Sequence, residues 1–305
     1  MQSSNIATIL KGGYDLHVHP EPDLIERSGD DFTFAKMAVE AGMAGIALKS
    51  HYFPTVERAK QVRKFYPGFE AIGGLCLNNY VGGLNPLAVE VFARAGGKIV
   101  WMPTVDSYNE YIFNSEGGVR QAHYWSKMQD ELRRSGVDFS PIKVLESNGK
   151  LGGKIQEVLE VMLRHNLILA TGHLSPSESI TLIENAYDLG MRRFIITHPE
   201  APSTFFDLDQ QKYLIKFGVF FERSYRIPAI NLTTWEYFFS EIKETSEARN
   251  VLATDLGQKD SVPPVVGMKE LIVRLMEAGF SAQGIRRMLV GNYRFLLGKE
   301  VEADE

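Results

Sequence analysis

The chain has 305 residues, of which 44% are hydrophobic and 23% are charged. This length suits a single α/β barrel, and the composition allows a large buried core. The formal net charge is −5 and no segment is rich in Lys and Arg, which argues against nucleic acid or an anionic membrane as the main partner. No stretch approaches the roughly 18 apolar residues that span a bilayer.

The N-terminal segment has no charged region followed by an apolar run, so we expect no signal peptide and a cytoplasmic protein. The single cysteine, Cys76, lies in an apolar run and cannot form an internal disulfide, so we expect a buried, inert thiol. The expected partner is a small-molecule substrate. The sequence leaves the oligomeric state open, and a homo-oligomer is one of the options.

Eight short apolar or β-branched runs recur along the chain and are predicted to be strands. They cover residues 14–19, 45–51, 70–78, 98–105, 167–173, 192–198, 218–224 and 250–255. Most are almost continuously apolar, as expected for strands that are covered on both faces.

The segments between these runs have the spacing of amphipathic helices, for example at Ile155, Val158 and Met162. Ser175 begins a capping box with proline at the first helical position, and Gly190 lies where that helix should end. Strands that alternate with helices fit a barrel or an open doubly wound sheet. We expect a (β/α)8 TIM barrel over residues 1–305 as one domain, because polar residues end strands in both halves of the chain and all eight ends meet at one mouth.

A long insertion follows the fourth predicted strand, over about residues 106–141. It contains several aromatic residues, namely Tyr108, Tyr111, Phe113, Tyr124 and Trp125. Connections of this length are usually functional or disordered, and this one is too aromatic for disorder. We expect a lid or a wall of the substrate pocket; a partly helical excursion that serves stability or oligomer contacts is the alternative.

His17 and His19 are two residues apart on the first predicted strand. The alternation of a strand places both imidazoles on one side and Leu16 and Val18 on the other. Two imidazoles about 6–7 Å apart at Cα can converge on one cation. A single pair of this kind is weak evidence for a metal site.

The same kind of residue ends three other predicted strands. His173, His198 and Asp255 each close an apolar run in a different part of the chain. For a single histidine, a role in the core or in a hydrogen bond at the strand end explains the position equally well. Together with His17 and His19, these residues predict a centre for one or two divalent cations at the mouth of the barrel.

These motifs resemble those of the amidohydrolase superfamily of metal-dependent hydrolases. HVH at 17–19, GH ending at His173, TH ending at His198 and TD ending at Asp255 carry the resemblance. It covers nearly the whole chain, since GNYRFLLG at 291–298 resembles the closing helix of such proteins. The resemblance implies that His17, His19 and Asp255 bind a first ion, while His173 and His198 bind a second ion or the substrate.

The sequence departs from that family at the fourth strand. Members with two ions usually carry a bridging carboxylated lysine or a glutamate there, whereas the nearest carboxylate here is Asp106. Lys49, on the second predicted strand, is therefore an unusual bridging carbamate, a partner for substrate charge, or a structural cation paired with Asp255 or Glu222. The number of ions stays open.

Three further residues are candidates for substrate binding. His51 shares a face of the second predicted strand with Lys49 by the same alternation, so we expect it to line the site. Glu222 lies near the end of the seventh strand. One of the nearby arginines, Arg223 or Arg226, could bind a carboxylate or phosphate of the substrate, although a solvated loop charge explains them equally well.

The ligand types indicate the chemistry. A divalent ion acidifies bound water to a pKa of about 7; Asp255 would accept the proton, and His173, His198 or Lys49 would help to polarise the scissile group. We expect hydrolysis of an amide, cyclic amide, lactone, ester or phosphoester. The expected metal is zinc, and manganese, iron, nickel and cobalt also accept these ligands. The alternatives are a decarboxylase with one metal ion that acts on an aromatic acid, and an inactive metal-binding barrel.

Overall fold

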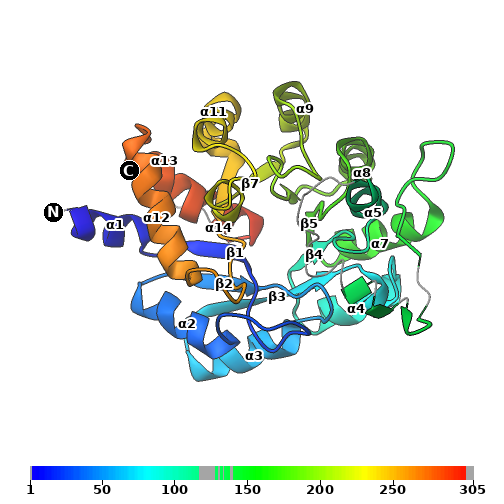
Figure 1. The fold of residues 1–305 in the computed structure, drawn as a ribbon, viewed down its shortest axis with the longest axis horizontal. Helices are drawn as coiled ribbons and strands as arrows, with labels where there is room; N and C mark the ends of the chain where they lie inside the picture. Colours follow the sequence, from blue (N-terminus) through cyan, green and yellow to red (C-terminus); the bar gives the residue numbers. More distant parts are fainter. Residues whose placement is uncertain (1, 117–127, 130, 133, 138–139, 300–305) are drawn as a thin grey trace.

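Eight parallel strands follow one another around a nearly closed barrel, and each is hydrogen-bonded to the next strand of the chain (Figure 1). The computed structural model describes residues 2–116, 128–129, 131–132, 134–137 and 140–299. The strands are β1 (Tyr14–Val18), β2 (Gly45–Leu48), β3 (Glu70–Cys76), β4 (Ile99–Trp101), β5 (Ile168–Ala170), β6 (Phe194–Ile196), β7 (Phe220–Ser224) and β8 (Asn250–Ala253). The predicted (β/α)8 barrel is therefore confirmed.

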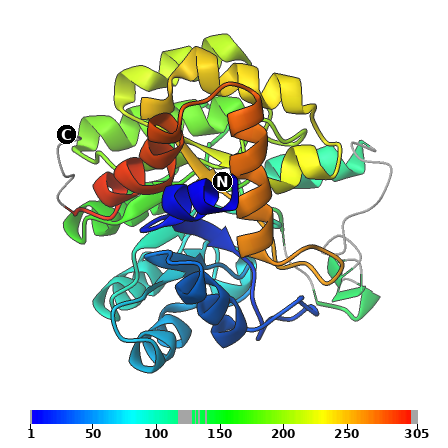
Figure 2. The same cartoon turned by 90° about the vertical axis from the view of Figure 1, so that its left-hand side faces the viewer.

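Helices surround this barrel on its outer face (Figure 1). The α-helices are α1 (Gln2–Leu10), α2 (Asp31–Glu40), α3 (Val56–Phe65), α4 (Pro86–Arg94), α5 (Tyr108–Ser115), α7 (Gly153–Arg164), α8 (Pro176–Leu189), α9 (Leu208–Leu214), α10 (Arg226–Ala229), α11 (Trp235–Thr245), α12 (Pro264–Glu277), α13 (Ala282–Arg286) and α14 (Asn292–Leu296). In Figure 2, α1 lies beside α12 and α13. None of the helices in the described ranges is long and apolar enough to cross a membrane.

The local start and stop signals of the helices act as the sequence predicts. Ser175 accepts a hydrogen bond from the backbone N–H of Glu178, and the Glu178 side chain accepts one from the Ser175 N–H, which completes the capping box of α8. Gly190 ends α8 with φ 111°, a conformation that an L side chain rarely adopts.

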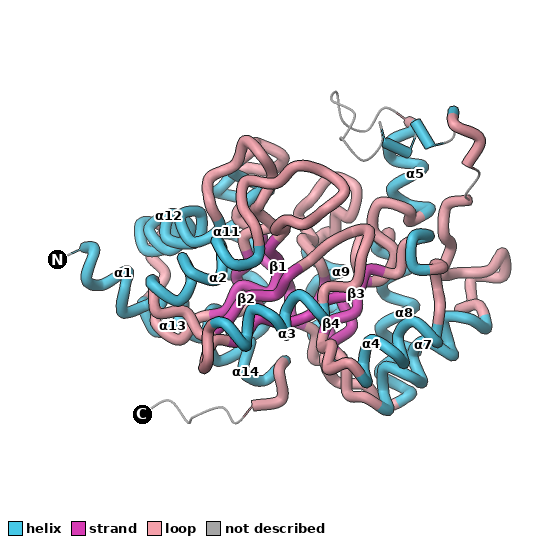
Figure 3. The backbone as a smooth tube through the Cα atoms, turned by 90° about the horizontal axis from the view of Figure 1, so that it is seen from below, coloured by secondary structure: helices cyan, strands magenta, loops and turns pink. Residues whose placement is uncertain are grey.

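The interior of the barrel is filled by apolar side chains that the strands direct inward. They include Leu16, Trp101 and Cys76, and burial raises the pKa of the Cys76 thiol to about 11, in keeping with an inert cysteine. Tyr293 of α14 joins this cluster and donates a hydrogen bond to the Leu252 carbonyl. Figure 3 shows α14 at one end of the strands and long loops at the other end.

Two expectations for the first strand and the last helix are wrong in detail. Leu16 belongs to the interior cluster, whereas Val18 packs among the outer helices. A shift in the β1–β2 register between Asp15 and Val18 breaks the simple alternation, so the interior receives both Leu16 and His17. The closing segment after Ser281 is also no single helix, because a π-helical turn at Arg287–Gly291 separates α13 from α14.

The strands are shorter than predicted, and most of the expected site residues lie in the loops just beyond them. Lys49 and His51 follow β2, His173 follows β5, and His198 and Asp255 follow β6 and β8. The long insertion begins with α5, while Tyr124 and Trp125 lie outside the described residues. The assignment of one domain over residues 1–305 and of a lid over residues 106–141 both remain predictions.

Candidate metal centre

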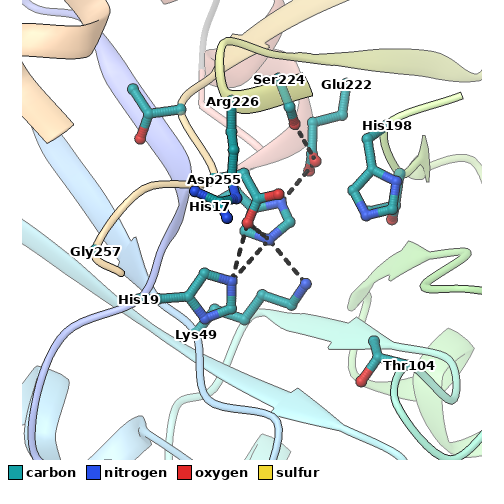
Figure 4. Close-up of polar contacts among 12 residues, drawn as sticks. His17, His19, Lys49, Thr104, His198, Glu222, Ser224, Arg226, Asp255 and Gly257 are labelled. Atoms are coloured by element: carbon teal, nitrogen blue, oxygen red, sulfur yellow. Dashed lines mark hydrogen bonds and ion pairs between the residues drawn. The ribbon is translucent and has the colours of Figure 1, made fainter. Parts of the chain in front are cut away.

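Three side chains meet where the last strand returns to the first. Nε2 of His17 lies 3.2 Å from Nε2 of His19, and each of these nitrogens lies 3.1 Å from Oδ1 of Asp255. Figure 4 shows the dashed lines that join these three residues. His17 and His19 are buried, and the side chain of Asp255 is 14% exposed.

Backbone hydrogen bonds close the barrel at this point. The N–H of Asp255 donates to the carbonyl of His17, and the N–H of His19 donates to the carbonyl of Leu256. Gly257 lies so close to the chain after β1 that a Cβ there would stand 1.9 Å from the His19 carbonyl oxygen. The closure of the barrel therefore brings these three side chains together.

Backbone strain accompanies two of the candidate site residues. Asp255 has φ 53° and His198 has φ 28°. Such conformations cost about 1–3 kcal/mol each for residues other than glycine, and they are found most often at functional sites.

Five imidazoles form a closed ring around the mouth. The distances between neighbouring ring centroids are 5.1 Å for His17–His19, 5.0 Å for His19–His51, 6.0 Å for His51–His173, 5.1 Å for His173–His198 and 6.1 Å for His198–His17. All five are buried. These are five of the seven histidines in the sequence, so the structure gathers most of its imidazoles at one end of the barrel.

In three members of this ring the Nδ1 atom forms a hydrogen bond with a neighbouring side chain, and in a fourth, His173, it lies at ion-pair distance from a carboxylate. The partners are Glu222 at 2.6 Å from His17, Thr104 at 2.8 Å from His51, Thr204 at 3.2 Å from His198 and Glu110 at 3.3 Å from His173. An imidazole fixed at one nitrogen can present the lone pair of the other nitrogen to a metal ion or a substrate. Nδ1 of His19, in contrast, is buried without a hydrogen bond.

The charges of the centre are strongly perturbed. Burial opposes a charge on His17, but the carboxylates of Glu222 and Asp255 outweigh this and raise its pKa to about 9. Burial lowers the pKa of His19, and together with the neighbouring His173 it lowers that of His198 to about 3. Burial also opposes a charge on Asp255, yet His17 and His19 hold its pKa well below the usual range. The carboxylate is thus anionic at neutral pH.

Lys49 reaches the same centre from the loop after β2. Its Nζ lies 2.8 Å from Nε2 of His17 and 5.1 Å from the centroid of the Trp101 ring. No ion pair within 4.0 Å joins Lys49 to Asp255 or Glu222, although its charge helps to lower the pKa of Glu222. The three alternative roles of Lys49 therefore remain predictions. Trp101, on β4, lies beneath the imidazole of His17.

The residues considered for substrate binding fall into two groups, those that lie at the centre or its mouth and those that lie away from it. Glu222 orients His17 and also accepts a hydrogen bond from Ser224, while His51 belongs to the imidazole ring. Arg226 is partly buried at the mouth (Figure 4), where its guanidinium donates to the side chain of Gln258.

Arg223 lies elsewhere, and the idea that it binds substrate is wrong. Its side chain is fully buried and forms ion pairs with Glu200 and Glu241, which belong to the loop after β6 and to α11. Asp106 accepts a hydrogen bond at Oδ2 from the Asn79 backbone N–H, and it does not belong to the compact group of His17, His19 and Asp255.

Several residues of the centre were missed by the sequence reasoning. Glu110, Thr104, Thr204 and Trp101 contact ring members, yet none of them stands in a recognisable motif. The one available signal for Glu110 was an acidic residue in the first turn of a helix within an aromatic insertion. That pattern alone indicates helix capping.

The group formed by His17, His19 and Asp255 fits a divalent cation. Ligand atoms at about 2.0–2.1 Å from one ion stand about 2.9–3.4 Å apart, and the three observed separations fall in that interval. Two imidazole nitrogens and one carboxylate oxygen are also a donor set that zinc and its neighbours accept. Among the described residues, this is the one group of three such side chains whose ligand atoms all lie within 4.8 Å of one another.

The fold is similar to that of solved hydrolase barrels. An amidohydrolase from Pseudomonas aeruginosa aligns at a TM-score of 0.64 with 12% identity, covering 97% of this chain and 98% of that chain. The TatD homologue YjjV from Escherichia coli K12 gives 0.56, with 16% identity and coverages of 94% and 98%. The organophosphorus hydrolase from Deinococcus radiodurans gives 0.54, with 13% identity and coverages of 94% and 93%.

The parallel barrel therefore has the same fold as these solved structures, and in this chain it carries a histidine pair at β1, histidines after β5 and β6 and an aspartate after β8. Residues 12–222 match a family described as being of unknown function, DUF6282. Because the match covers more than half of the chain, the protein belongs to that family. A comparison with curated proteins gave no match.

Proposed function

We propose that this protein is a metal-dependent hydrolase that acts on an amide, cyclic amide, lactone or phosphoester of a small molecule. One observation carries the proposal: the mutual separations of 3.1–3.2 Å among Nε2 of His17, Nε2 of His19 and Oδ1 of Asp255. His17, His19 and Asp255 would hold a divalent cation, which we propose to be zinc, and the bound ion would supply a water molecule whose pKa is about 7 instead of 15.7.

Asp255 is the proposed proton acceptor. Its carboxylate is anionic and lies at the same group, where it can take a proton from water and pass it to the leaving group. Replacing Asp255 is therefore the direct test of the proton transfer.

Lys49 is the proposed donor toward the substrate, and His198, a neutral imidazole, is the proposed second catalytic contact, which offers a nitrogen lone pair at the same mouth. Both are buried at the mouth, and Nζ of Lys49 carries three donors. A donor that is already in place when negative charge develops on a carbonyl or phosphoryl oxygen stabilises the transition state. His51, Glu222 and Arg226 line or support the same space, and Arg226 is the proposed contact for an anionic part of the substrate.

The proposed range of substrates follows from the chemistry of the centre rather than from a shaped pocket. Water activated in this way attacks carbonyl carbon and phosphorus alike. The organophosphorus hydrolase with the same fold illustrates the phosphoester case by its name, and the resemblance of the motifs favours amides and cyclic amides.

Decarboxylation of an aromatic acid is the competing proposal. A centre with one ion suits either reaction, and Trp101 beneath His17 provides an aromatic surface in the barrel. Release of carbon dioxide without uptake of water would favour this reading, and absence of any turnover with an ion bound would favour an inactive metal-binding barrel.

The experiment combines elemental analysis with a substrate screen. Protein purified without a chelator should contain a divalent metal, and it should hydrolyse at least one member of a panel of amides, lactones and phosphoesters. Chelation should abolish this activity and added zinc should restore it. A protein that binds no divalent cation, with intact folding by circular dichroism, would exclude the proposed function.

A further inference from the structure

We propose that Lys49 takes the place of a second metal ion, so that the centre holds one divalent cation and the ammonium group provides the remaining positive charge. The inference rests on the proposed function, because it assumes a cation at His17, His19 and Asp255. It concerns how many ions the ring of five imidazoles can accept.

The position of Lys49 is the first reason. Its side chain is 1% exposed, its Nζ lies 2.8 Å from Nε2 of His17, and the Trp101 ring supports it at 5.1 Å. The same charge acts on His17, His19, His51 and Glu222. Lys49 therefore stands among the ring members rather than at their edge.

The second reason is that the other imidazoles of the ring bring no negative charge to offset the repulsion between a second cation and the ammonium of Lys49, whose charge acts on His51. Two cations held about 3.5–4 Å apart need negatively charged ligands between them, and β4 places Trp101 at this level of the barrel. His51, His173 and His198 offer neutral nitrogens. The carboxylate of Glu110 contacts the Nδ1 side of His173, and the described residues form no second group of three ligands as compact as the first.

Charge balance gives the third reason. Asp255 and Glu222 contribute two negative charges to the buried centre and Lys49 contributes one positive charge. A single divalent cation leaves this group close to neutral, whereas two cations beside an ammonium leave a large positive excess. At the margin, Arg27 is paired with Asp23, Glu110 lies against His173, and Arg226 donates to Gln258. Burial makes an uncompensated charge costly.

Ion binding would also change the hydrogen-bond partners of Lys49. A cation bound at Nε2 of His17 would occupy the position that Nζ of Lys49 contacts in the structure. Its three N–H donors then need other acceptors, and an oxygen of the substrate can fill that need. The same residue would thus exclude a second ion and contact the reacting group.

The test is the ion content of the wild type and of Lys49→Met, measured after saturation with zinc and removal of loosely held metal. We expect about one ion per chain in the wild type and a ratio that rises toward two in Lys49→Met. Lys98→Met, at an exposed lysine before β4, is the matched control and should keep a ratio of one. Two ions in the wild type, or one ion in Lys49→Met, would overturn the proposal.

No ion in the wild type would instead contradict the proposed function, so the two failures are distinguishable. If Lys49→Met does not fold, Lys49→Gln serves as a second variant. Anomalous scattering from zinc in wild-type crystals gives an independent answer. One peak at His17, His19 and Asp255 supports the inference, and a second peak among His51, His173 and His198 contradicts it.

A carbamate at Lys49 is the specific competitor to exclude. The amine would bond to the carbon of carbon dioxide and release a proton, and the resulting anion could bridge two ions. Wild-type protein saturated with zinc should show no carbamate resonance after incubation with ¹³C-bicarbonate. A resonance that disappears in Lys49→Met would overturn the proposal.

Discussion

The Nδ1 atom of His17 lies 2.6 Å from Oε1 of Glu222, and both side chains are 1% exposed. A buried carboxylate in this position fixes the tautomer of the imidazole and increases its basicity as a metal ligand. Glu222 enters from β7, on a different part of the barrel from β1.

We therefore predict that Glu222→Gln lowers zinc affinity about 10- to 100-fold. The amide preserves the shape of the side chain but removes its charge. Competition with a chromophoric chelator measures the affinity. Glu236→Gln, on the exposed face of α11, is the control and should bind zinc like the wild type. Equal affinities for the wild type and Glu222→Gln would show that the contact has no role in the centre.

Asp255→Asn should lower kcat about 10²- to 10⁴-fold while the fold is preserved, because the amide cannot accept the proton of the attacking water. Steady-state kinetics on the substrate found in the screen gives kcat, and circular dichroism monitors folding. Asp188→Asn, at an exposed position of α8, is the control. Unchanged turnover in Asp255→Asn would reject the proton transfer.

Zinc binding should release more than one proton per ion at pH 7–8, about one from His17 and a further fraction from the bound water, whose pKa would be about 7. In the metal-free protein the pKa of His17 is raised to about 9, so this imidazole is protonated below that pH and must lose its proton to ligate. Asp255 and His19 are already unprotonated, since their pKa values are lowered. The apparent affinity should therefore rise at least tenfold per pH unit up to about pH 9, and less steeply above it.

Calorimetric titration in buffers with different ionisation enthalpies measures the protons released. Glu222→Gln provides the internal control, because loss of the carboxylate that raises the pKa of His17 should reduce the release at pH 8. A binding enthalpy that is independent of the buffer would contradict this prediction.

Arg223→Met should lower the free energy of unfolding by about 3–5 kcal/mol, because it leaves Glu200 and Glu241 buried without their cation. Chemical denaturation measures the loss. Arg94→Met, which removes an exposed ion pair with Glu90, should leave the stability nearly unchanged. Adding Glu200→Gln and Glu241→Gln to Arg223→Met should recover part of the loss; failure to do so would point to lost packing instead.

The repeating strands and helices of the barrel could be predicted because both depend on local patterns. Runs of apolar residues mark the strands, and the capping box at Ser175 and the glycine at Gly190 delimit α8 through contacts within a few residues. His17, His19, His173, His198 and Asp255 were identified as one set because parallel strands deliver their C-terminal ends to one mouth.

The partners of these residues could not be predicted in the same way. Arg223 and Arg226 both lie near the end of the seventh predicted strand, and the sequence does not distinguish them. In the structure Arg223 is buried between a strand and helices, whereas Arg226 reaches the mouth. Glu110 meets His173 only after α5 is placed over β5. Such pairings depend on packing between elements that are distant in the chain.

By itself, the sequence determined the alternation of strands and helices and the residue types available for a cation. The tertiary structure decided which of them meet. His17 and Asp255 are 238 positions apart by their numbers, and the hydrogen bond from the Asp255 N–H to the His17 carbonyl brings them together at the seam of the barrel. That closure, and the ammonium of Lys49 inside it, depend on the packing of all eight strands, which no local pattern encodes.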